Sequence, residues 1–591
     1  MSQATTGAPA ERPTLVVADG LAARQWELVL AEREIAAGTT AWQTPEIQPY
    51  AGWLETLWLE SGEPRGAPLT PRQSRALWRR VIAESKEADD LIGVAGVADW
   101  AAAAWELLHR WRIDPGAERA SAGQLDYRAL LSWCRDYRER LDTSGWVDRA
   151  ELERRLATAP PRRALARVAL TDLGDSYPAR DELLGALIAA GAELAQAEKP
   201  RRAGRTRAAR LGDAGDELRA AFAWARQALE QVPGRRVAVV VAGLAERQNE
   251  VARLVATAFG GRDVPVWNAG QPLGTDATVG AAFNALTLLS SSTGYAAFGR
   301  WLCSRSFNML PGELAARAEL DVRLRTELRS QVRFVTAYRE CGLATALAQR
   351  APDSAARLVA ALAVVGTRER ATPGGWAHLW THYLRELGWV PPSGSRLTAW
   401  QASLDELASL TAVLGEMSID AALAELERIL ATSAPAPLPV RGVHILGRIE
   451  QVGPGYDAAW VSGFTDSYWP EAPQGSPLLP RALQRARGMP RATPQDARDR
   501  SARSMARLVA SVPDLVVSWP ARVHDYETEP SPAIREWPRA EPAEIPHGRQ
   551  NAERARARVT IEDPPGAIER AELPGGAGML NRQARSPLLA Y

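Results

Sequence analysis

Lysine is nearly absent from this chain of 591 residues, in which Lys86 and Lys199 are the only two. A phosphate-binding loop of the nucleotide-hydrolysing kind needs a lysine after a glycine-rich turn, because backbone amides cradle the phosphates and the lysine reaches them. Lys86 lies in the polar stretch AESKEADD and Lys199 in AEKPRR, and neither follows a glycine-rich turn. The sequence therefore predicts that this chain does not hydrolyse ATP through such a loop.

Cysteines and long apolar runs are also scarce. Cys134, Cys303 and Cys341 are far apart and lack metal-ligand spacing, so a disulfide scaffold and a self-contained zinc site are both disfavoured. No apolar run approaches the ~20 residues that span a bilayer, and the first residues lack the basic start and apolar core of a signal peptide. We expect a cytoplasmic protein that does not bind membranes.

The formal net charge is only +1, so any attraction to nucleic acid must come from local patches. The stretch from Pro480 to Arg507 is the strongest candidate, because eight arginines there face only two aspartates. Its arginines are Arg481, Arg485, Arg487, Arg491, Arg498, Arg500, Arg503 and Arg507. A solvated helical face explains the same pattern, and the sequence leaves both interpretations open.

Catalytic motifs are missing as well. The sequence contains no GxSxG, no HExxH and no Cys/His pairing. Glu84-Ser85-Lys86 matches half of a PD-(D/E)xK nuclease site, but no aspartate lies between Asp19 and Lys86 to complete it. His378 and His382 have helical i,i+4 spacing without an acidic residue after the first histidine, which disfavours a metal site. We expect no cofactor and no nuclease activity from this polypeptide alone.

What the chain does have is an ordered stretch from Val440 to Pro480. An apolar run (Val443 to Leu446), a turn at Gly453-Pro454-Gly455 and a second apolar run (Ala458 to Val461) lead to a loop with Trp469 and Pro470. This pattern resembles a segment of superfamily-one DNA helicases. More closely, it is similar to the AddB/RecC-like family of DNA repair proteins, the partner subunits of bacterial DNA-end-processing helicase-nucleases.

An α/β fold is expected from the residues themselves, because Arg167 to Ala195 reads as a strand-helix-strand unit of a parallel sheet. The resemblance implies two RecA-like parallel-sheet domains, each with a helical insertion. The expected segments are 1–12, a disordered N-terminus; 13–69 and 158–200, the first RecA-like domain; 70–157, its helical insertion; 201–212, a linker; 213–299 and 440–535, the second RecA-like domain; 300–439, its helical insertion; 536–575, a linker; and 576–591, the start of a truncated nuclease-like domain.

The motor residues of the resembled helicases are missing or displaced. The loop after the first strand is Asp19-Gly20-Leu21-Ala22, without a lysine. Asp172 and Asp175 fall near the position of a magnesium-binding acidic pair, and we expect them to be solvated loop carboxylates instead. The loop of sequence Lys-Gly-Leu-Glu in helicases is Val452 to Gly455 here, and Arg507 lies one helical turn from the place of the γ-phosphate arginine. The resemblance therefore implies a helicase-like fold without motor chemistry.

The resemblance also implies a function. We expect a non-motor DNA-binding or scaffolding subunit of an AddAB/RecBCD-like helicase-nuclease in double-strand-break repair and recombination. Its partners would be single-stranded DNA or duplex ends, and a UvrD/AddA-like subunit. The candidate DNA contacts are Arg448, Tyr456, Trp469, Arg481, Arg485, Arg487 and Arg491. Core packing is the competing role for Tyr456 and Trp469.

Two alternatives remain open. The first is a scaffold whose tryptophan-rich helices bind protein partners and never DNA. The second is a fragment of a PD-(D/E)xK exonuclease subunit whose catalytic domain is missing. At the C-terminus, Ser586-Pro587-Leu588 stands where a Cys-Pro-Phe is common in the resembled family, so an iron-sulfur ligand is not expected.

Overall fold

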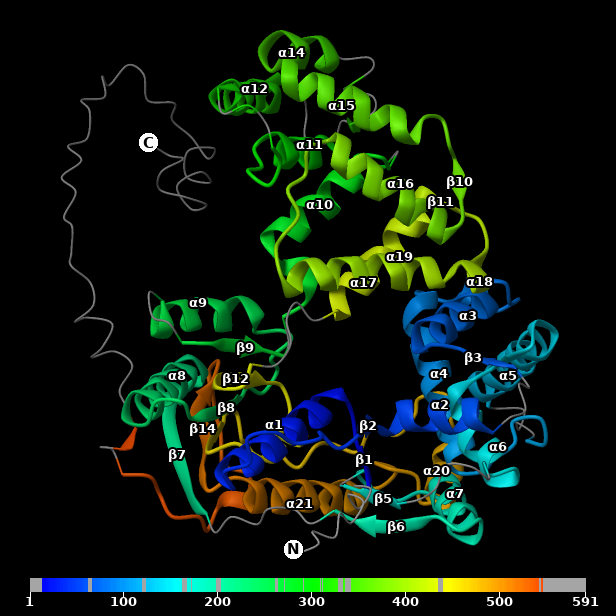
Figure 1. The fold of residues 1–591 in the computed structure, drawn as a ribbon, viewed down its shortest axis with the longest axis vertical. Coiled ribbons are helices and arrows are strands. Elements are labelled where there is room, and N and C mark those ends of the chain that lie inside the picture. Colours follow the sequence, from blue (N-terminus) through cyan, green and yellow to red (C-terminus); the bar gives the residue numbers. More distant parts are fainter. Residues whose placement is uncertain are drawn as a thin grey trace, which may run out of the picture. The chain divides into compact units, whose positions relative to one another are not determined.

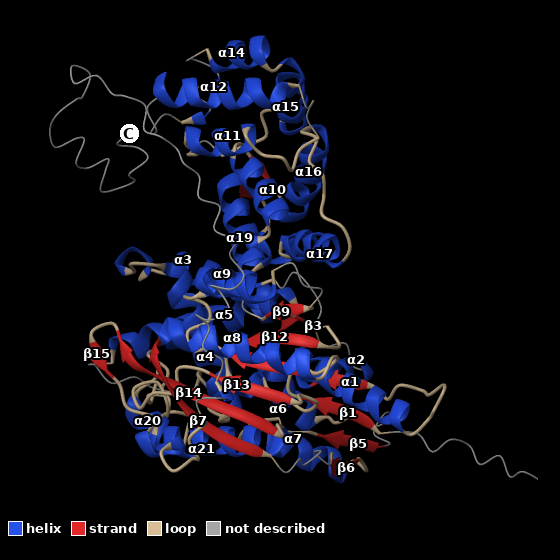
Figure 2. Cartoon of the chain, turned by 90° about the vertical axis from the view of Figure 1, so that its left-hand side faces the viewer, coloured by secondary structure: helices blue, strands red, loops and turns tan. Residues whose placement is uncertain are grey.

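Two parallel β-sheets form the α/β part of the structure (Figures 1 and 2), which confirms the predicted α/β class. The computed structural model describes residues 13–545 except 62–65, 119–123, 162–166, 172, 198–203, 261–263, 270, 291, 309, 311, 328–332, 335–337, 339–341, 434–438 and 542–543. The predicted N-terminal segment 1–12 and the predicted nuclease-like start 576–591 lie outside these residues.

The first sheet has four parallel strands in the order β2-β1-β5-β6. Its strands are β1 (Thr14–Val17), β2 (Ile47–Pro49), β5 (Arg167–Leu170) and β6 (Glu193–Gln196). Leu15 lies in register with Ile47 on one side and Ala169 on the other. The carboxyl ends of all four strands therefore meet at one edge of the sheet.

Helices cover both faces of this sheet. Helix α1 (Gly20–Ala36) covers one face, where its Trp26 shares a core with Leu15 and Val17. The opposite face carries Val16, which shares a core with three helices. These helices are α2 (Tyr50–Glu60), α6 (Leu152–Thr158) and α7 (Pro178–Ala189). Side chains alternate across a strand, so a fully apolar run such as Leu15 to Val17 requires cover on both faces.

The second sheet is larger. Its strands run in the order β9-β12-β8-β13-β14, and β14 pairs further with β7 and, in antiparallel orientation, with β15. Their bounds are β7 (Arg205–Asp213), β8 (Arg236–Val240), β9 (Val266–Asn268), β12 (Gly442–Leu446), β13 (Ala458–Val461), β14 (Asp514–Val523) and β15 (Tyr526–Glu527). The two predicted runs of the stretch Val440 to Pro480 are thus β12 and β13, on either side of β8.

This sheet is also covered on both faces. Helices α8 (Ala214–Gln231) and α9 (Gln248–Phe259) share a core with Val237 and Val239 of β8. Helix α21 (Pro494–Ser511) shares the opposite core with Val240. Such burial on both faces explains why β8 reads as an uninterrupted apolar run in the sequence.

The remaining helices form two segments that share one hydrophobic core. The first segment holds α3 (Pro71–Ala83), α4 (Val94–Arg110) and α5 (Leu125–Ser144). The second holds α10 (Ala277–Thr287), α11 (Tyr295–Leu302), α12 (Glu313–Glu327), α14 (Leu343–Arg350), α15 (Pro352–Val365), α16 (Pro373–Glu386), α17 (Ser395–Ser409), α18 (Thr411–Leu414) and α19 (Ile419–Thr432). Arg72 and Arg79 of α3 tie the segments together through Glu406 at 2.7 Å and Glu425 at 2.5 Å.

Short elements complete the described chain. Strand β3 (Ala67–Pro68) pairs with β4 (Trp146–Val147), and β10 (Arg370–Ala371) pairs with β11 (Met417–Ser418). Single 3-10 turns occupy Ala88–Asp90, Arg149–Glu151, Leu273–Thr275, Ile449–Gln451 and Pro532–Ile534. Among the residues that the structure describes, no helix is both long and apolar enough to cross a membrane.

Three predicted boundaries need correction. Most of the predicted linker 201–212 is the strand β7, whose register with β14 runs from Arg205 to Asp213. Helix α10, predicted within the second sheet domain, packs in the helical core. The predicted linker 536–575 begins on the sheet, because the Ala540 N–H donates to the Ala208 carbonyl of β7 at 2.9 Å.

Candidate functional site between the two sheets

A cavity of about 910 Å³ lies at the carboxyl ends of β1, β5 and β6. The first sheet contributes the β1–α1 turn, the loop after β5 and Ala197 after β6. The second sheet contributes residues 448–454 after β12 and several residues of α21. Ligands of parallel α/β sheets bind outside the carboxyl ends of the strands, so this cavity is the first candidate site.

The turn between β1 and α1 contains an acid where a phosphate-binding loop would hold an anion. The Asp19 carboxylate accepts a hydrogen bond from the Ala22 N–H at 2.8 Å and caps α1. This carboxylate occupies the positive end of the helix dipole and would repel a phosphate there. No lysine is among the described residues that line the cavity.

Asp175, in the loop after β5, is the most heavily paired carboxylate of the cavity. Three arginines of α21 surround it: Arg503 at 2.9 Å, Arg500 at 3.3 Å and Arg507 at 3.7 Å. The hydrogen bond to Asp175 is the main reason that the pKa of Arg503 is raised. This corrects the expectation of a solvated carboxylate at Asp175, whereas Asp172 lies outside the described residues.

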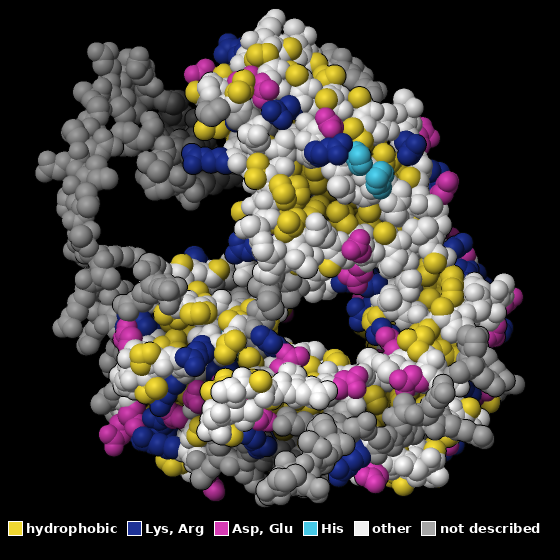
Figure 3. Space-filling model, in the orientation of Figure 1, with side chains coloured by type: hydrophobic (Ala, Val, Ile, Leu, Met, Phe, Trp, Pro, Cys, Tyr) yellow, Lys and Arg dark blue, Asp and Glu magenta, His cyan; other side chains and the backbone are white. Residues whose placement is uncertain are grey.

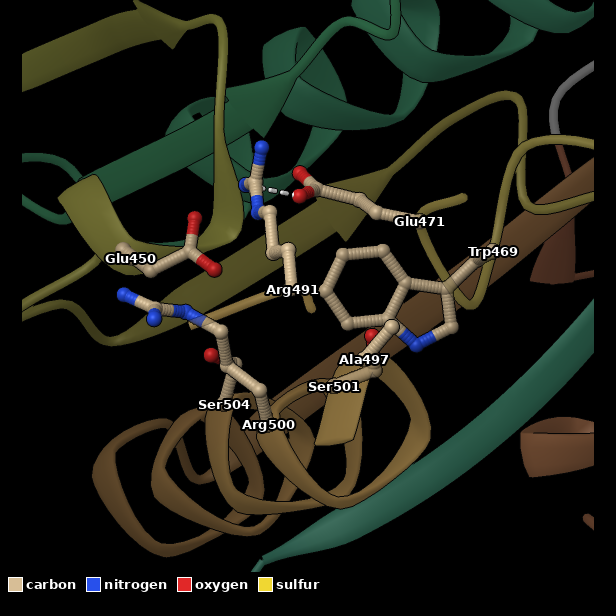
Figure 4. A pocket seen from close by; sticks show the side chains of 8 residues that line it. All are labelled: Glu450, Trp469, Glu471, Arg491, Ala497, Arg500, Ser501 and Ser504. Carbon is tan, nitrogen blue, oxygen red and sulfur yellow. Dashed lines mark hydrogen bonds and ion pairs between the residues drawn. The ribbon is translucent and has the colours of Figure 1, made fainter. Parts of the chain in front are cut away.

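The charges around the cavity are balanced. Among the described residues, four arginines line it, and so do four carboxylates. They are Arg448, Arg491, Arg500 and Arg507, and Asp19, Asp175, Glu450 and Glu471. A side pocket shows the arrangement closely: Glu471 pairs with Arg491, and Glu450 and Arg500 lie beside them (Figure 4). The described part of the wall therefore offers a polyphosphate no net attraction.

Two of the predicted DNA contacts, Arg448 and Arg491, belong to this wall. Arg448 is exposed and precedes the 3-10 turn Ile449–Gln451. Arg491 is half-buried, and its guanidinium pairs with Glu471. Its backbone has a φ of 61°, and its N–H donates to the Asp496 carboxylate. Arg491 is therefore engaged within the fold, whereas the Arg448 side chain remains accessible.

Arg481, Arg485 and Arg487 lie outside the cavity, on or directly after helix α20 (Arg481–Ala486). All three are exposed, and no ion pair joins them to another described residue. The helix is held by Gln484, whose amide donates to the carbonyls of Ser476 at 2.9 Å and Leu479 at 2.7 Å. The fold thus presents three uncompensated guanidinium groups within seven positions of the sequence.

Tyr456 and Trp469 are core residues, which corrects their prediction as DNA contacts. Tyr456 is fully buried, and its hydroxyl lies 3.0 Å from Nδ1 of His444. Burial raises the pKa of Tyr456 and lowers the pKa of His444 to about 3. Trp469 is 4% exposed and packs on Phe464 with ring centroids 5.3 Å apart. Neither ring has a face open to a base, so packing is the role that the structure gives them.

Other predicted features behave as ordinary parts of the fold. His378 and His382 of α16 lie with ring centroids 4.6 Å apart, and the described residues contain no group of three or more potential metal ligands. Cys134 is buried, Cys303 is exposed, and Cys341 lies outside the described residues. On the face shown in Figure 3, basic side chains are interspersed with acidic ones.

Sequence reasoning missed the residues that join α1 to the second sheet beside the cavity. Gln25 of α1 donates to the Gln451 carbonyl at 2.8 Å, and Glu32 of α1 pairs with Arg236 of β8 at 2.7 Å. No spacing in the sequence links these positions, because partners across two sheets leave no local periodicity. The one local signal in the sequence is Arg236, a charged residue directly before the apolar run Val237 to Val241.

The fold and cavity define an α/β protein with two doubly covered parallel sheets. Among known proteins, a scan against family models and a search of curated proteins each found no match.

Proposed function

We propose that this chain is a non-motor DNA-binding and scaffolding subunit of an AddAB/RecBCD-like helicase-nuclease that acts in double-strand-break repair and recombination. The two sheets would be RecA-like domains, and the two helical segments their insertions. The observation that carries the DNA-binding role is the exposed arginine cluster Arg481, Arg485 and Arg487. Unpaired guanidinium groups are the side chains best suited to hold a phosphate backbone.

Two features of the cavity support a role without a motor. Asp19 caps α1 at the β1–α1 turn, and the charges of the described lining residues cancel. A bound nucleotide would therefore find neither a phosphate cradle nor a favourable field. The proposed partner is a UvrD/AddA-like subunit that supplies the motor, and this chain would hold that partner on DNA.

Replacing the three arginines of the cluster by alanine tests the proposal. We expect the triple variant Arg481→Ala, Arg485→Ala, Arg487→Ala to bind single-stranded and forked DNA more weakly than the native chain. Because each phosphate contact contributes roughly 0.7 to the slope of log affinity against log salt on single strands, the slope should fall by about 2. Fluorescence anisotropy over a salt series measures both quantities.

A matched triple variant separates local contact from net charge. Arg33, Arg253 and Arg368 are exposed on α1, on α9 and after α15, and their replacement by alanine removes the same total charge. We expect this control to keep nearly the native salt slope. The proposal would be contradicted if the two triple variants had equal slopes of log affinity against log salt. It would also be contradicted if the DNA affinity of the native chain did not change with salt concentration.

The rival scaffold without DNA binding depends on accessible tryptophans. Most tryptophans of the helical segments are core residues, with Trp78, Trp105, Trp301, Trp376 and Trp380 fully buried. Trp100 of α4 is the one that favours the rival, because 52% of its surface is exposed. A Trp100→Ala variant that loses partner binding while the chain shows no DNA affinity would support the scaffold instead.

A further inference from the structure

The glycine turn after β12 packs directly on α1. Gln25 donates to the Gln451 carbonyl at 2.8 Å, and a Cβ added to Gly453 would lie 1.9 Å from Oε1 of Gln25. A Cβ added to Gly455 would lie 2.6 Å from Cγ2 of Val29 and 2.4 Å from Nη1 of Arg236. Gly455 also has a φ of +93°, which favours glycine. A methyl group at Gly453 would therefore have to displace the end of Gln25, and one at Gly455 would have to displace Val29 and Arg236.

A buried guanidinium lies behind this turn. Arg236 is 2% exposed and donates to the carbonyls of Val440 and Gly455, each at 2.9 Å. Its remaining nitrogen, Nη2, pairs with Glu32 of α1 at 2.7 Å. One side chain of β8 thus fixes the turn and, through Glu32, the helix of the other sheet. A charged group this deeply buried is tolerated only when its donors are satisfied.

The sheets touch again elsewhere on the cavity wall, where Asp175 meets Arg500, Arg503 and Arg507. These side chains are between about a quarter and a half exposed, with Asp175 at 28% and Arg503 at 48%. Solvent screens such pairs, and it also screens Glu32, whose side chain is 50% exposed, so these pairs contribute less than the buried contacts of Gln25 and Arg236 with the glycine turn. These pairs matter because they join the two sheets at a second place. A hinge motion about the glycine turn would have to break them.

We propose that Gln25, Glu32, Arg236 and the turn Gly453-Pro454-Gly455 form a fixed joint that holds the two sheets at a single separation. Close-packed contacts of this kind are either made or broken and do not stretch. The cavity would therefore keep one shape, and nucleotide would not drive it open or closed. This inference concerns the mechanics of the chain, and it holds equally for a chain that does not bind DNA.

Distances between spin labels on the two sheets test the joint in the full chain. Ile188 of α7 and Val232 after α8 are exposed, at 56% and 46%, and each is replaced by cysteine for labelling. Cys134, Cys303 and Cys341 are first replaced by alanine or serine. Double electron-electron resonance should give one narrow distance distribution, and the same distribution with magnesium and ATP. Two native distances, or a shift on addition of magnesium and ATP, would overturn the joint.

Variants of the joint provide the second arm. Gly453→Ala displaces the side-chain amide of Gln25, which carries the hydrogen bond to Gln451, so the single peak should be lost in favour of a broader distribution at longer distances. Glu32→Gln keeps the shape of the side chain and removes the charge that pairs with Arg236, so it should broaden the peak less than Gly453→Ala does. It replaces Gly453→Ala as the test if that variant does not fold. Gly52→Ala on α2, where a Cβ meets nothing within 4 Å, is the control and should leave the peak unchanged. A native peak in both joint variants would refute the proposal.

Discussion

At the scale of single residues, Glu217 of α8 is a carboxyl that is fully buried against the second sheet. Its Oε1 accepts from the Gly463 N–H at 2.7 Å and from the Ser518 hydroxyl at 2.5 Å. Its Oε2 is buried and has no partner among the described residues. Burial raises the pKa of Glu217 to about 7, although Ser518, Gly463 and Arg247 oppose the rise. The native state therefore favours a neutral carboxyl at this position.

This shift predicts how stability depends on pH. A carboxyl whose pKa is raised by folding stabilises fully below its unfolded value near 4.5, and that contribution is lost as the pH rises to about 7. The loss is about 3 kcal/mol. Glu217→Gln stays neutral throughout, so relative to the native chain it should gain that amount between pH 4.5 and 8. Urea unfolding at both pH values measures the change, and Glu427→Gln, exposed on α19, should show none.

At the scale of elements, the sequence predicts buried strands well and edge strands poorly. The runs that became β8, β12 and β13 are apolar on both faces, so their burial is visible without a structure. Strand β7 reads as a linker in the sequence, because its arginines interrupt the alternation of apolar and polar residues that indicates a strand. In the structure Arg207 pairs with Asp514 and Glu544, partners far away in the sequence.

The candidate site was predicted in part, for the same reason. The turn from Asp19 to Ala22 is a local feature, and its lack of a lysine is visible in the sequence. In the structure Asp19 caps α1 there. The arginines of α21 were also visible as a run. Their engagement by Asp175 and the contact of Gln25 with Gln451 join distant segments. Such pairs depend on how the sheets dock, which no spacing records.

The contact of α3 with α19 yields a prediction at this scale. Arg79 and Glu425 are 17% and 11% exposed, and Glu425 is also paired with Arg428 at 2.8 Å. Loss of one partner of a buried pair is strongly destabilising, but Arg428 offsets part of the loss, so Arg79→Ala should cost about 2 kcal/mol. A double-mutant cycle with Glu425→Ala measures the coupling by urea unfolding. Arg24→Ala breaks the exposed pair with Glu27 and should cost no more than about 0.5 kcal/mol.

At the scale of the whole molecule, the two helical insertions are predicted as separate segments, but in the structure they share one hydrophobic core. All described residues belong to one compact unit. The helical core joins residues from both helical segments, and it also takes in Leu478, Leu479 and Met489 from the chain that follows β13. A segment such as α3 therefore loses buried surface when a distant helix unfolds. The two helical segments are joined through α3, whose Arg80 donates to the Val413 carbonyl of α18 at 2.9 Å and whose Arg79 pairs with Glu425 of α19.

This shared core predicts that the two helical segments unfold in one cooperative transition. Hydrogen exchange measured by mass spectrometry in increasing urea should give peptides of α4 and α16 the same midpoint, because both helices contribute to one hydrophobic core. Arg79→Ala weakens the link between the helical segments, so it should separate the midpoints of α4 and α16 or lower both together. Distinct midpoints in the native chain would contradict the prediction, since they would mean that the two segments fold independently.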